Sequence, residues 1–339
     1  MLHKSSIIIH QLKKISILDI SIRQKNSILL LTKIPNNNCF STAMESPETS
    51  KNINDKRTAG IIIIGDEILK GHTKDLNASF LLSKLWTNGV AVQKVSFISD
   101  NIDKIAKEIK SFSTDYSFVI TCGGIGPTHD DMTFEALSKA FDDPLVLNGE
   151  LVEKIKLLTS TENLSPGFVK MASLPKSTKL ITGHDPITNS QVKYPLFNIK
   201  NVFVFPGVPE FMQKSFTINQ DLFVSNNHFY LMKIYISVDE SVISKELEEL
   251  DSNFTDVSIG SYPMLNDIYK VKLTLESENS NSLKNAFDSL MKMLPSQVII
   301  SVKKCEPNSR EDHHELMINT NEGNTRPRIM SQTQCKDYS

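Results

Sequence analysis

The chain has 339 residues, of which 40% are apolar and 22% are charged, and its formal net charge at pH 7 is −2. This length is enough for two domains, and the apolar share is sufficient for an ordinary hydrophobic core. The near-neutral charge argues against nucleic acid as a partner, and no apolar run approaches the roughly 20 residues that a membrane-spanning helix needs.

Residues 1–57 differ in composition from the rest of the chain. Up to Ala43 they include six basic residues and a single acid, Asp19, among many Ile, Leu and Ser residues. This composition favours a leader that directs the protein to the mitochondrial matrix. The alternative is that the sequence before Met44 has no role and that the protein is cytoplasmic, because Met44 could itself start a protein just before the polar linker. The four cysteines lack metal-ligand spacing and fit a reducing compartment.

A first domain is expected over residues 58–225. Gly60 to Ile64 is a β-branched run, typical of a parallel strand that is buried on both faces. Helical and strand patterns alternate after it, which predicts a doubly wound, mostly parallel α/β sheet. The expected elements are helix 75–88, strand 90–98, helix 102–112, strand 116–121, helix 132–141, helix 150–158 and strand 202–205.

A glycine-rich turn follows the strand at 116–121. Gly123, Gly124 and Gly126 allow the backbone to approach a ligand closely. The N–H groups of such a turn, together with the N-terminus of the helix behind it, form a site suited to phosphate. We expect Thr128, at the end of the turn, to contact the same ligand.

Two adjacent carboxylates, Asp130 and Asp131, follow this turn. Beside bound phosphates they would repel the ligand unless a cation lay between them, so the pattern predicts a phosphorylated ligand with a divalent cation. The alternative is that one aspartate caps the helix that follows, although this leaves the second carboxylate unexplained.

Two other strand ends present residues suited to the same site. Asp66 and Glu67 follow the first strand, and Pro206-Gly207 follows the strand at 202–205. Because ligands in open α/β sheets bind beyond the carboxyl ends of the strands, we expect these residues in one crevice with the turn. Asp131, Asp66 and Glu67 are then the candidate metal ligands, and Pro206-Gly207 contacts the ligand. The alternative for Asp66 and Glu67 is an exposed turn with ordinary acids.

The remainder of the chain predicts a connection, a second domain and a tail. Residues 159–200 are expected to be irregular, because prolines interrupt them. Lys170, Lys176 and Lys179 lie there and could reach an anionic ligand, although exposed lysines are usually only solvated. Residues 230–303 show the order strand, helix, strand, strand, helix, strand, which predicts a small ferredoxin-like α+β domain. Residues 304–339 are polar and aperiodic, which predicts a disordered tail.

Two segments resemble a known family. Residues 58–71 (TAGIIIIGDEILKG) and 121–133 (TCGGIGPTHDDMT) are similar to the molybdopterin-binding (MoaB/Mog-type) domain of eukaryotic FAD synthase. The same domain type occurs in the competence/damage-inducible protein A (CinA) family. Residues 205–210, 259–263 and 271–275 extend the likeness, so that it covers roughly residues 58–302.

The resemblance implies a molybdenum-cofactor-biosynthesis-like α/β fold and, in the FAD-synthase branch, metal-dependent hydrolysis of FAD to FMN and AMP. It implies that the N–H groups from Gly123 to Gly126 hold the phosphates. It also implies that Asp131, with Asp130 or Asp66, acts as a catalytic residue with a divalent cation (Mg, Mn or Co). Relatives of this domain type often form homo-oligomers.

The sequence departs from the family in two places. It shows no segment resembling the adenylyltransferase domain of FAD synthase, so we do not expect it to make FAD by itself. Leu76 stands where the family has a hydroxyl residue. Two alternatives to a hydrolase stay open: a non-catalytic module that binds a flavin or pterin nucleotide, and a molybdopterin adenylyltransferase.

Overall fold

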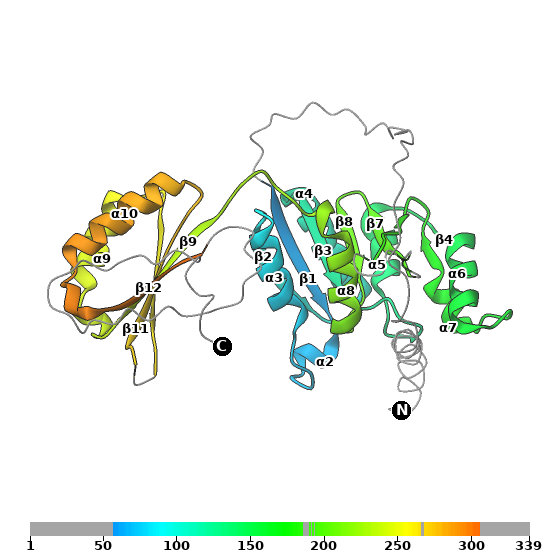
Figure 1. Ribbon diagram of the computed structural model, residues 1–339. Coiled ribbons are helices and arrows are strands. Elements are labelled where there is room, and N and C mark those ends of the chain that lie inside the picture. The colour runs from blue at the N-terminus through cyan, green and yellow to red at the C-terminus, as the bar shows by residue number, and fades with distance from the viewer. Residues whose placement is uncertain (1–56, 186–189, 191, 193, 266–267, 306–339) are drawn as a thin grey trace, which may run out of the picture.

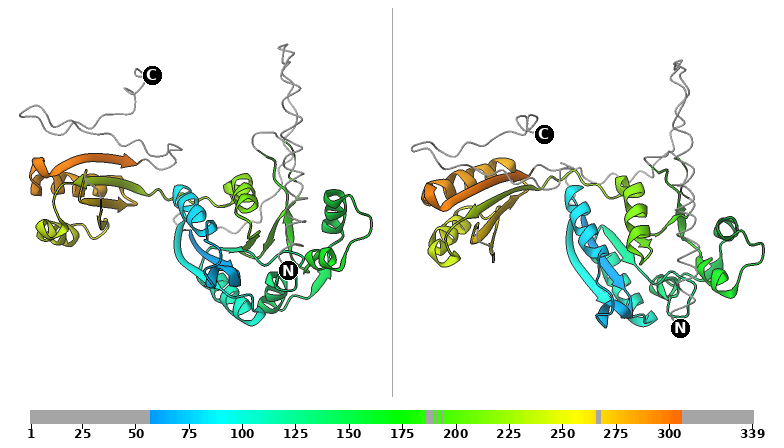
Figure 2. Two further views of the ribbon diagram at one scale, coloured as in Figure 1. Left: turned by 90° about the horizontal axis from the view of Figure 1, so that it is seen from below. Right: turned by 60° about the horizontal axis from the view of Figure 1, so that its bottom comes forward.

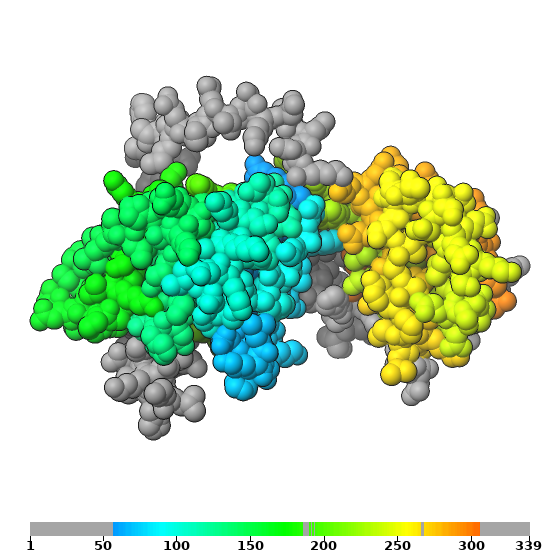
Figure 3. Space-filling view, turned by 180° about the vertical axis from the view of Figure 1, so that it is seen from behind, coloured from blue at the N-terminus to red at the C-terminus, as the bar shows by residue number. Residues whose placement is uncertain are grey.

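The computed structural model describes residues 57–185, 190, 192, 194–265 and 268–305. These residues form two lobes, one from residues 58–222 and one from residues 230–305, which can be followed in Figures 1 and 2. Figure 3 shows the same two lobes from behind, with the second lobe in yellow and orange. No helix within the described ranges is long and apolar enough to cross a membrane.

The first lobe is built on a six-stranded sheet. In spatial order its strands are β2 (Ala91–Ile98), β1 (Thr58–Ile64), β3 (Phe118–Cys122), β8 (Val202–Phe205), β7 (Leu196–Ile199) and β6 (Lys179–Ile181). The first four run parallel, and β7 and β6 are antiparallel to their neighbours. The carboxyl ends of four neighbouring strands therefore meet at one edge of the sheet.

Helices pack on both faces of this sheet. The helices of this lobe are α2 (Asp66–Leu69), α3 (Asn77–Thr87), α4 (Ile102–Asp115), α5 (Thr133–Phe141), α6 (Gly149–Thr159), α7 (Pro166–Met171) and α8 (Pro209–Asn219), with the 3-10 turn η1 (Gln220–Leu222). Ile62 and Ile64 of β1 belong to the core under α4 and α5, whereas Ile61 and Ile63 belong to the core under α3 and α8. This burial on both sides confirms the doubly wound α/β sheet.

The position of α4 shows how the sequence sets these elements. Ile105, Ile109 and Phe112 recur at helical spacing and are buried. The side chain of Asn101 accepts hydrogen bonds from the N–H groups of Asp103 and Lys104, so it satisfies two backbone donors that the first turn leaves free. The apolar stripe thus places α4 on the sheet, and the cap fixes where it begins.

The second lobe is a four-stranded antiparallel sheet in the spatial order β10 (Ser258–Pro263), β11 (Val271–Ser277), β9 (Tyr230–Ile236) and β12 (Ile299–Cys305). Its helices are α9 (Ser244–Asn253) and α10 (Ser280–Met293), with the 3-10 turns η2 (Glu240–Val242) and η3 (Ser296–Val298). Val271, Leu273 and Leu275 alternate along β11 and enter one core with both helices. This chain order and strand order confirm the ferredoxin-like α+β unit.

Two expectations require correction. Residues 159–200 are not irregular throughout, because they include α7, β5 (Ser173–Pro175), β6 and β7, and β5 pairs with β4 (Leu145–Leu147). Short strands of three or four residues leave too little pattern for sequence periodicity to reveal. The expected tail begins two residues too early, because β12 continues to Cys305. The rest of the tail, and the expected leader up to residue 56, lie outside the described residues.

Candidate functional site

β3 ends in a turn that requires glycine at two positions. Gly123 and Gly124 have φ angles of +107° and +65°, which other residues rarely adopt. A Cβ atom at position 123 would lie 2.2 Å from the carbonyl oxygen of Ile64, so the end of β1 passes directly against the turn. Thr133 donates from its N–H group to Gly124 O (3.0 Å) and from its hydroxyl to Gly123 O (2.8 Å). The turn is therefore fixed between β1 and the start of α5.

Three N–H groups of this turn are available to an anion. Those of Gly124, Ile125 and Gly126 donate to no acceptor within the described part of the chain. The N–H group of Gly123, which we expected to contact phosphate, instead donates to the carbonyl oxygen of Phe205 at 3.1 Å. That expectation is wrong, because Gly123 continues the hydrogen-bond ladder between β3 and β8. Its role is to allow the turn, not to donate to a ligand.

Neither aspartate of the turn caps α5. The N-cap residue is Met132, and no side chain accepts a capping hydrogen bond there. Asp131 stabilises the preceding turn instead, since its Oδ2 accepts hydrogen bonds from the Thr128 N–H group at 2.9 Å and from the Thr128 hydroxyl. The carboxylate lies so close to Gly126 that a Cβ atom there would be 2.6 Å from Oδ2. Thr128 therefore supports Asp131. Asp130 is exposed beside His129, and a hydrogen bond from the Thr128 side chain lowers the pKa of its carboxyl.

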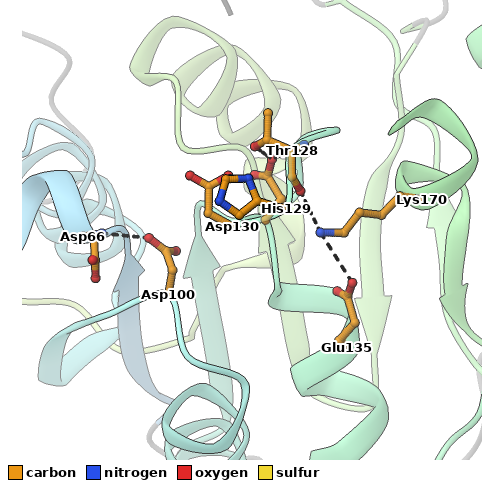
Figure 4. A network of polar contacts seen from close by, with 8 residues as sticks. Asp66, Asp100, Thr128, His129, Asp130, Glu135 and Lys170 are labelled. Carbon is orange, nitrogen blue, oxygen red and sulfur yellow. Dashed lines mark hydrogen bonds and ion pairs between the residues drawn. The ribbon is translucent and has the colours of Figure 1, made fainter. Parts of the chain in front are cut away.

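The acids that follow β1 open the short helix α2. Asp66 Oδ2 accepts a hydrogen bond from Lys70 Nζ at 2.7 Å, and this contact lowers the pKa of the Asp66 carboxyl. The backbone N–H group of Asp66 donates to Asp100 Oδ2 at 2.9 Å, as the dashed line in Figure 4 shows. Glu67 is exposed. The end of β1 is thus tied to the segment that follows β2.

Asp100 belongs to this edge although no sequence pattern singled it out. Burial raises the pKa of the Asp100 carboxyl, and the hydrogen bond from the Asp66 N–H group lowers it. The carboxylates of Glu67, Asp66 and Asp130 raise this pKa further. In Figure 4 Asp100 lies between Asp66 and Asp130. Its place directly after a parallel strand is the same signal that identified Asp66. Neighbouring carboxylates that disfavour one another's charge are a feature of functional sites.

The corner after β8 contacts the glycine turn. A Cβ atom at Gly207 would lie 3.2 Å from the Cα atom of Gly123, so the two backbones pass close together. The side-chain amide of Asn77 donates to Gly207 O at 2.7 Å, which joins the start of α3 to this corner. Asp75 accepts hydrogen bonds from the N–H groups of Asn77 and Ala78 and so caps the same helix. Pro206 is half-buried between β8 and the corner.

A small cavity of about 60 Å³ opens between these strand ends. Glu67, Asp75, Asn77 and Gly207 are among its lining residues, together with apolar side chains of β1, α2 and the residue before α3. Asn77 is 5% exposed, and its Oδ1 atom has no hydrogen-bond partner among the described residues. A buried acceptor without a partner is costly, so this cavity favours a ligand or a water molecule that donates a hydrogen bond.

The structure brings the expected residues to one edge but does not gather a three-ligand metal centre. Within the described ranges, no three His, Cys, Asp or Glu side chains are placed so that they could hold a metal ion. Asp131 faces Thr128, and Asp66 faces Lys70. The metal set of Asp131, Asp66 and Glu67 therefore stays a prediction.

A larger cavity of about 650 Å³ lies on the second lobe. Its lining includes Asp251, Asp256, Glu276 and Glu278, and neither Lys nor Arg is among the residues that form it. Carboxylates in the lining of a cavity disfavour a phosphorylated ligand. We therefore place the candidate site at the strand ends of the first lobe, where backbone donors are available.

The doubly wound sheet, the glycine turn and the carboxylates at its edge define a molybdopterin-binding-type (MoaB/Mog-like) domain. Residues 60–220 match the family described as a probable molybdopterin binding domain. Residues 228–303 match the middle domain of FAD synthase. The chain therefore contains both of these domains, and FAD synthase-like and CinA-like proteins are among its relatives.

Several known proteins are similar to this chain. A probable FAD synthase of Caenorhabditis elegans is 37% identical over 265 residues, which cover 72% of this chain and 51% of that protein. A protein of Archaeoglobus fulgidus is 32% identical over 203 residues, with coverage of 60% and 84%. The solved structure of CinA from Thermoplasma acidophilum is 28% identical, covers 50% of this chain and 98% of its own, and has a TM-score of 0.45. The chain spans about half the length of the FAD synthases that it matches.

Proposed function

We propose that this protein is a metal-dependent nucleotide pyrophosphatase that hydrolyses FAD to FMN and AMP. One observation supports this above the others: free backbone donors and carboxylates lie at the same edge of one parallel sheet. The N–H groups of Gly124, Ile125 and Gly126 suit the oxygen atoms of a diphosphate. Asp66 and Asp130 both lie near enough to Asp100 to help raise the pKa of its carboxyl, which burial raises most. The relatives named FAD synthases supply the flavin nucleotide as the substrate class.

The residues at this edge fit a divalent cation. Mg²⁺ sites on nucleotides commonly use one or two protein carboxylates and take the remaining ligands from phosphate and water, so a three-carboxylate centre is not required. Only Oδ2 of Asp131 is engaged by Thr128. The cation would therefore be held by Asp131 Oδ1 and by the carboxylates of Asp130 and Asp66. When bound, the cation would polarise the diphosphate and activate water.

The protein's own residues then have separate roles. The three free amides bind and orient the diphosphate, and Thr128 keeps the Asp131 carboxylate in one position. Gly207 lies beside Gly123 and closes the far side of the site, while the side-chain carbonyl of Asn77 accepts a hydrogen bond from the ligand or from ordered water. Lys70 offsets the charge of Asp66 and so reduces the repulsion between this edge and the phosphates.

Product analysis tests this proposal. The full chain is incubated with FAD and Mg²⁺, Mn²⁺ or Co²⁺, and FMN and AMP are separated by chromatography; NADH and ADP-ribose serve as competing substrates. We expect equal amounts of FMN and AMP, no reaction after chelation, and turnover reduced at least about a hundredfold by Asp131→Ala. Asp288→Ala, an exposed aspartate on α10, is the matched control and should retain full turnover. Intact FAD with every cation would refute the proposal.

A second candidate is a non-catalytic module that binds a flavin nucleotide. The engagement of Asp131 with Thr128 and of Asp66 with Lys70 favours it, because both contacts compete with a cation for the carboxylates. Calorimetry separates the two candidates. Tight binding of FAD in the presence of Mg²⁺, with no FMN formed over hours, would support the module.

A further inference from the structure

The turn with Asp130 and Asp131 is contacted from outside by the short helix α7. Lys170 Nζ donates to the carbonyl oxygen of Thr128 at 2.7 Å and lies 3.5 Å from the carboxylate of Glu135 on α5. Figure 4 shows the ammonium group between these two partners. The Lys170 side chain is only 26% exposed, so its position is set by these contacts and not by solvent. A lysine from a segment that the sequence predicted as irregular thus reaches the candidate site.

A second contact joins α7 to the same turn. A Cβ atom at Gly167 would lie 2.8 Å from the carbonyl oxygen of Pro127 and 2.9 Å from its Cβ atom. The first turn of α7 therefore packs directly on Pro127, with no room for a side chain. Because Lys170 lies one turn further along, the helix contacts two consecutive residues of the turn.

Thr128 connects this contact to the candidate catalytic group. Its carbonyl oxygen accepts from Lys170 at 2.7 Å and from the Asp131 N–H group at 3.3 Å. Its own N–H group and hydroxyl donate to Asp131 Oδ2. Every polar group of Thr128 is therefore used, and the position of Asp131 depends on Thr128 remaining in place. Loss of the lysine would leave the Thr128 carbonyl with its longer and weaker bond alone.

We propose that Lys170 is a positioning residue of the site, which fixes the Thr128–Asp131 turn so that its carboxylates and the free amides of residues 124–126 face one ligand. Its effect on catalysis rests on the proposed function, but its effect on the turn does not. A charge-assisted hydrogen bond from Lys170 is about twice as strong as a neutral one, which suits it to hold a solvent-exposed turn. The pKa of the Asp130 carboxyl is lowered mainly by the Thr128 side chain, and the positive charge of Lys170 contributes to the same effect.

Three variants of the full chain test this role. Lys170→Met removes the ammonium group and keeps most of the side-chain volume, and Lys170→Arg keeps a donor. Lys156→Met is the matched control, because Lys156 also pairs with a glutamate (Glu153, 3.0 Å) but lies on α6. The measurements are hydrogen exchange of peptides that cover residues 124–132 and the separate kcat and KM values for FAD.

We expect Lys170→Met to raise exchange in residues 124–132 roughly tenfold and to leave exchange in the second lobe unchanged. We expect kcat to fall roughly tenfold or more with a smaller change in KM, because a displaced carboxylate affects the reaction more than the binding of the nucleotide. Lys170→Arg should restore both within about threefold, and Lys156→Met should match the wild type.

Each other outcome overturns the proposal. Unchanged exchange in the turn of Lys170→Met shows that the lysine does not hold it, and an equal change in Lys156→Met shows a general effect of lost charge. If Lys170→Met does not fold, Lys170→Arg decides: a folded Arg variant with a loosened turn contradicts the proposal, and one with an unchanged turn supports it. If the wild type leaves FAD intact, the proposed function fails, and the exchange measurement still decides the role of Lys170.

Discussion

The two lobes place their polar groups differently. In the first lobe four neighbouring strands run parallel, so the glycine turn, Asp66, Asp100 and the Pro206-Gly207 corner meet at one edge. In the second lobe all paired strands are antiparallel, so successive strand ends alternate between two edges. Its cavity is the larger one and is lined by acids without Lys or Arg. Strand direction, and not cavity size, therefore decides where amide donors and carboxylates come together.

The largest expected effect comes from Gly123→Ala. The added Cβ would meet the Ile64 carbonyl oxygen at 2.2 Å, and φ of +107° is strained for alanine. We expect the free energy of unfolding to fall by about 2–4 kcal/mol and FAD turnover to be lost. Denaturant unfolding measures the first and FMN release the second.

The control for this change is Gly149→Ala at the start of α6. A Cβ atom there would meet no atom within 4 Å, and Gly149 is not among the described glycines with positive φ. Its stability should stay within about 0.5 kcal/mol of the wild type or rise slightly. Equal losses in the two variants would show that the turn at 123 has no special geometry.

A smaller loss of stability is expected from Asn77→Ala, which removes the link between α3 and the Gly207 corner. The change removes the 2.7 Å hydrogen bond to Gly207 O and should lower the free energy of unfolding by about 1–3 kcal/mol. It should also weaken FAD binding in a titration, because the buried Oδ1 acceptor disappears. Asn285→Ala, at an exposed position of α10, is the control. No change in either quantity would exclude Asn77 from the site.

The sequence predicted those parts of the first lobe whose structure depends on a few neighbouring residues. Examples are the β-branched run of β1, the apolar stripe of α4 and the glycine turn. The fold class and the edge where Asp66, Asp131 and Gly207 meet follow from them, because parallel strands must end together.

The parts that sequence did not predict depend on contacts between distant segments. The N–H group of Gly123 is used by Phe205, which lies far along the chain and becomes a neighbour only when β3 pairs with β8. Lys170 reaches Thr128 only because α7 packs on Pro127. Asp100 could have been predicted as a site residue, since it follows a strand as Asp66 does. Apolar and polar residues alternate poorly along β2, so the residues after this strand were not considered.

The stability of the protein should depend on pH through Asp100. The folded-state pKa of Asp100 is raised, so between the unfolded and folded pKa values the native state binds more protons than the unfolded state. Stability without added cation should therefore increase as the pH falls through the folded pKa of Asp100. Asp100→Asn should be more stable than the wild type at neutral pH and should lose that advantage in acid. Thermal unfolding across pH measures this, and a less stable variant at neutral pH would contradict it.

The smallest effect is expected in the second lobe. Glu276→Gln combined with Asp256→Asn removes two of the four carboxylates that line the larger cavity. Trp86 Nε1 donates a hydrogen bond to Glu276 at 3.1 Å, and the amide oxygen introduced by Glu276→Gln can still accept it. FAD turnover and KM should therefore stay within about twofold of the wild type. A loss of turnover in this double variant would move the site to the second lobe.

The most direct measurement follows individual backbone amides by NMR as FAD and Mg²⁺ are added to the full chain. We expect the amide signals of Gly124, Ile125 and Gly126 to shift strongly, and that of Gly123 to shift little because it already donates to Phe205. The shifts should require both the nucleotide and the cation. Shifts confined to residues around the larger cavity, or unchanged signals in residues 124–126 at saturating FAD, would contradict the proposed site.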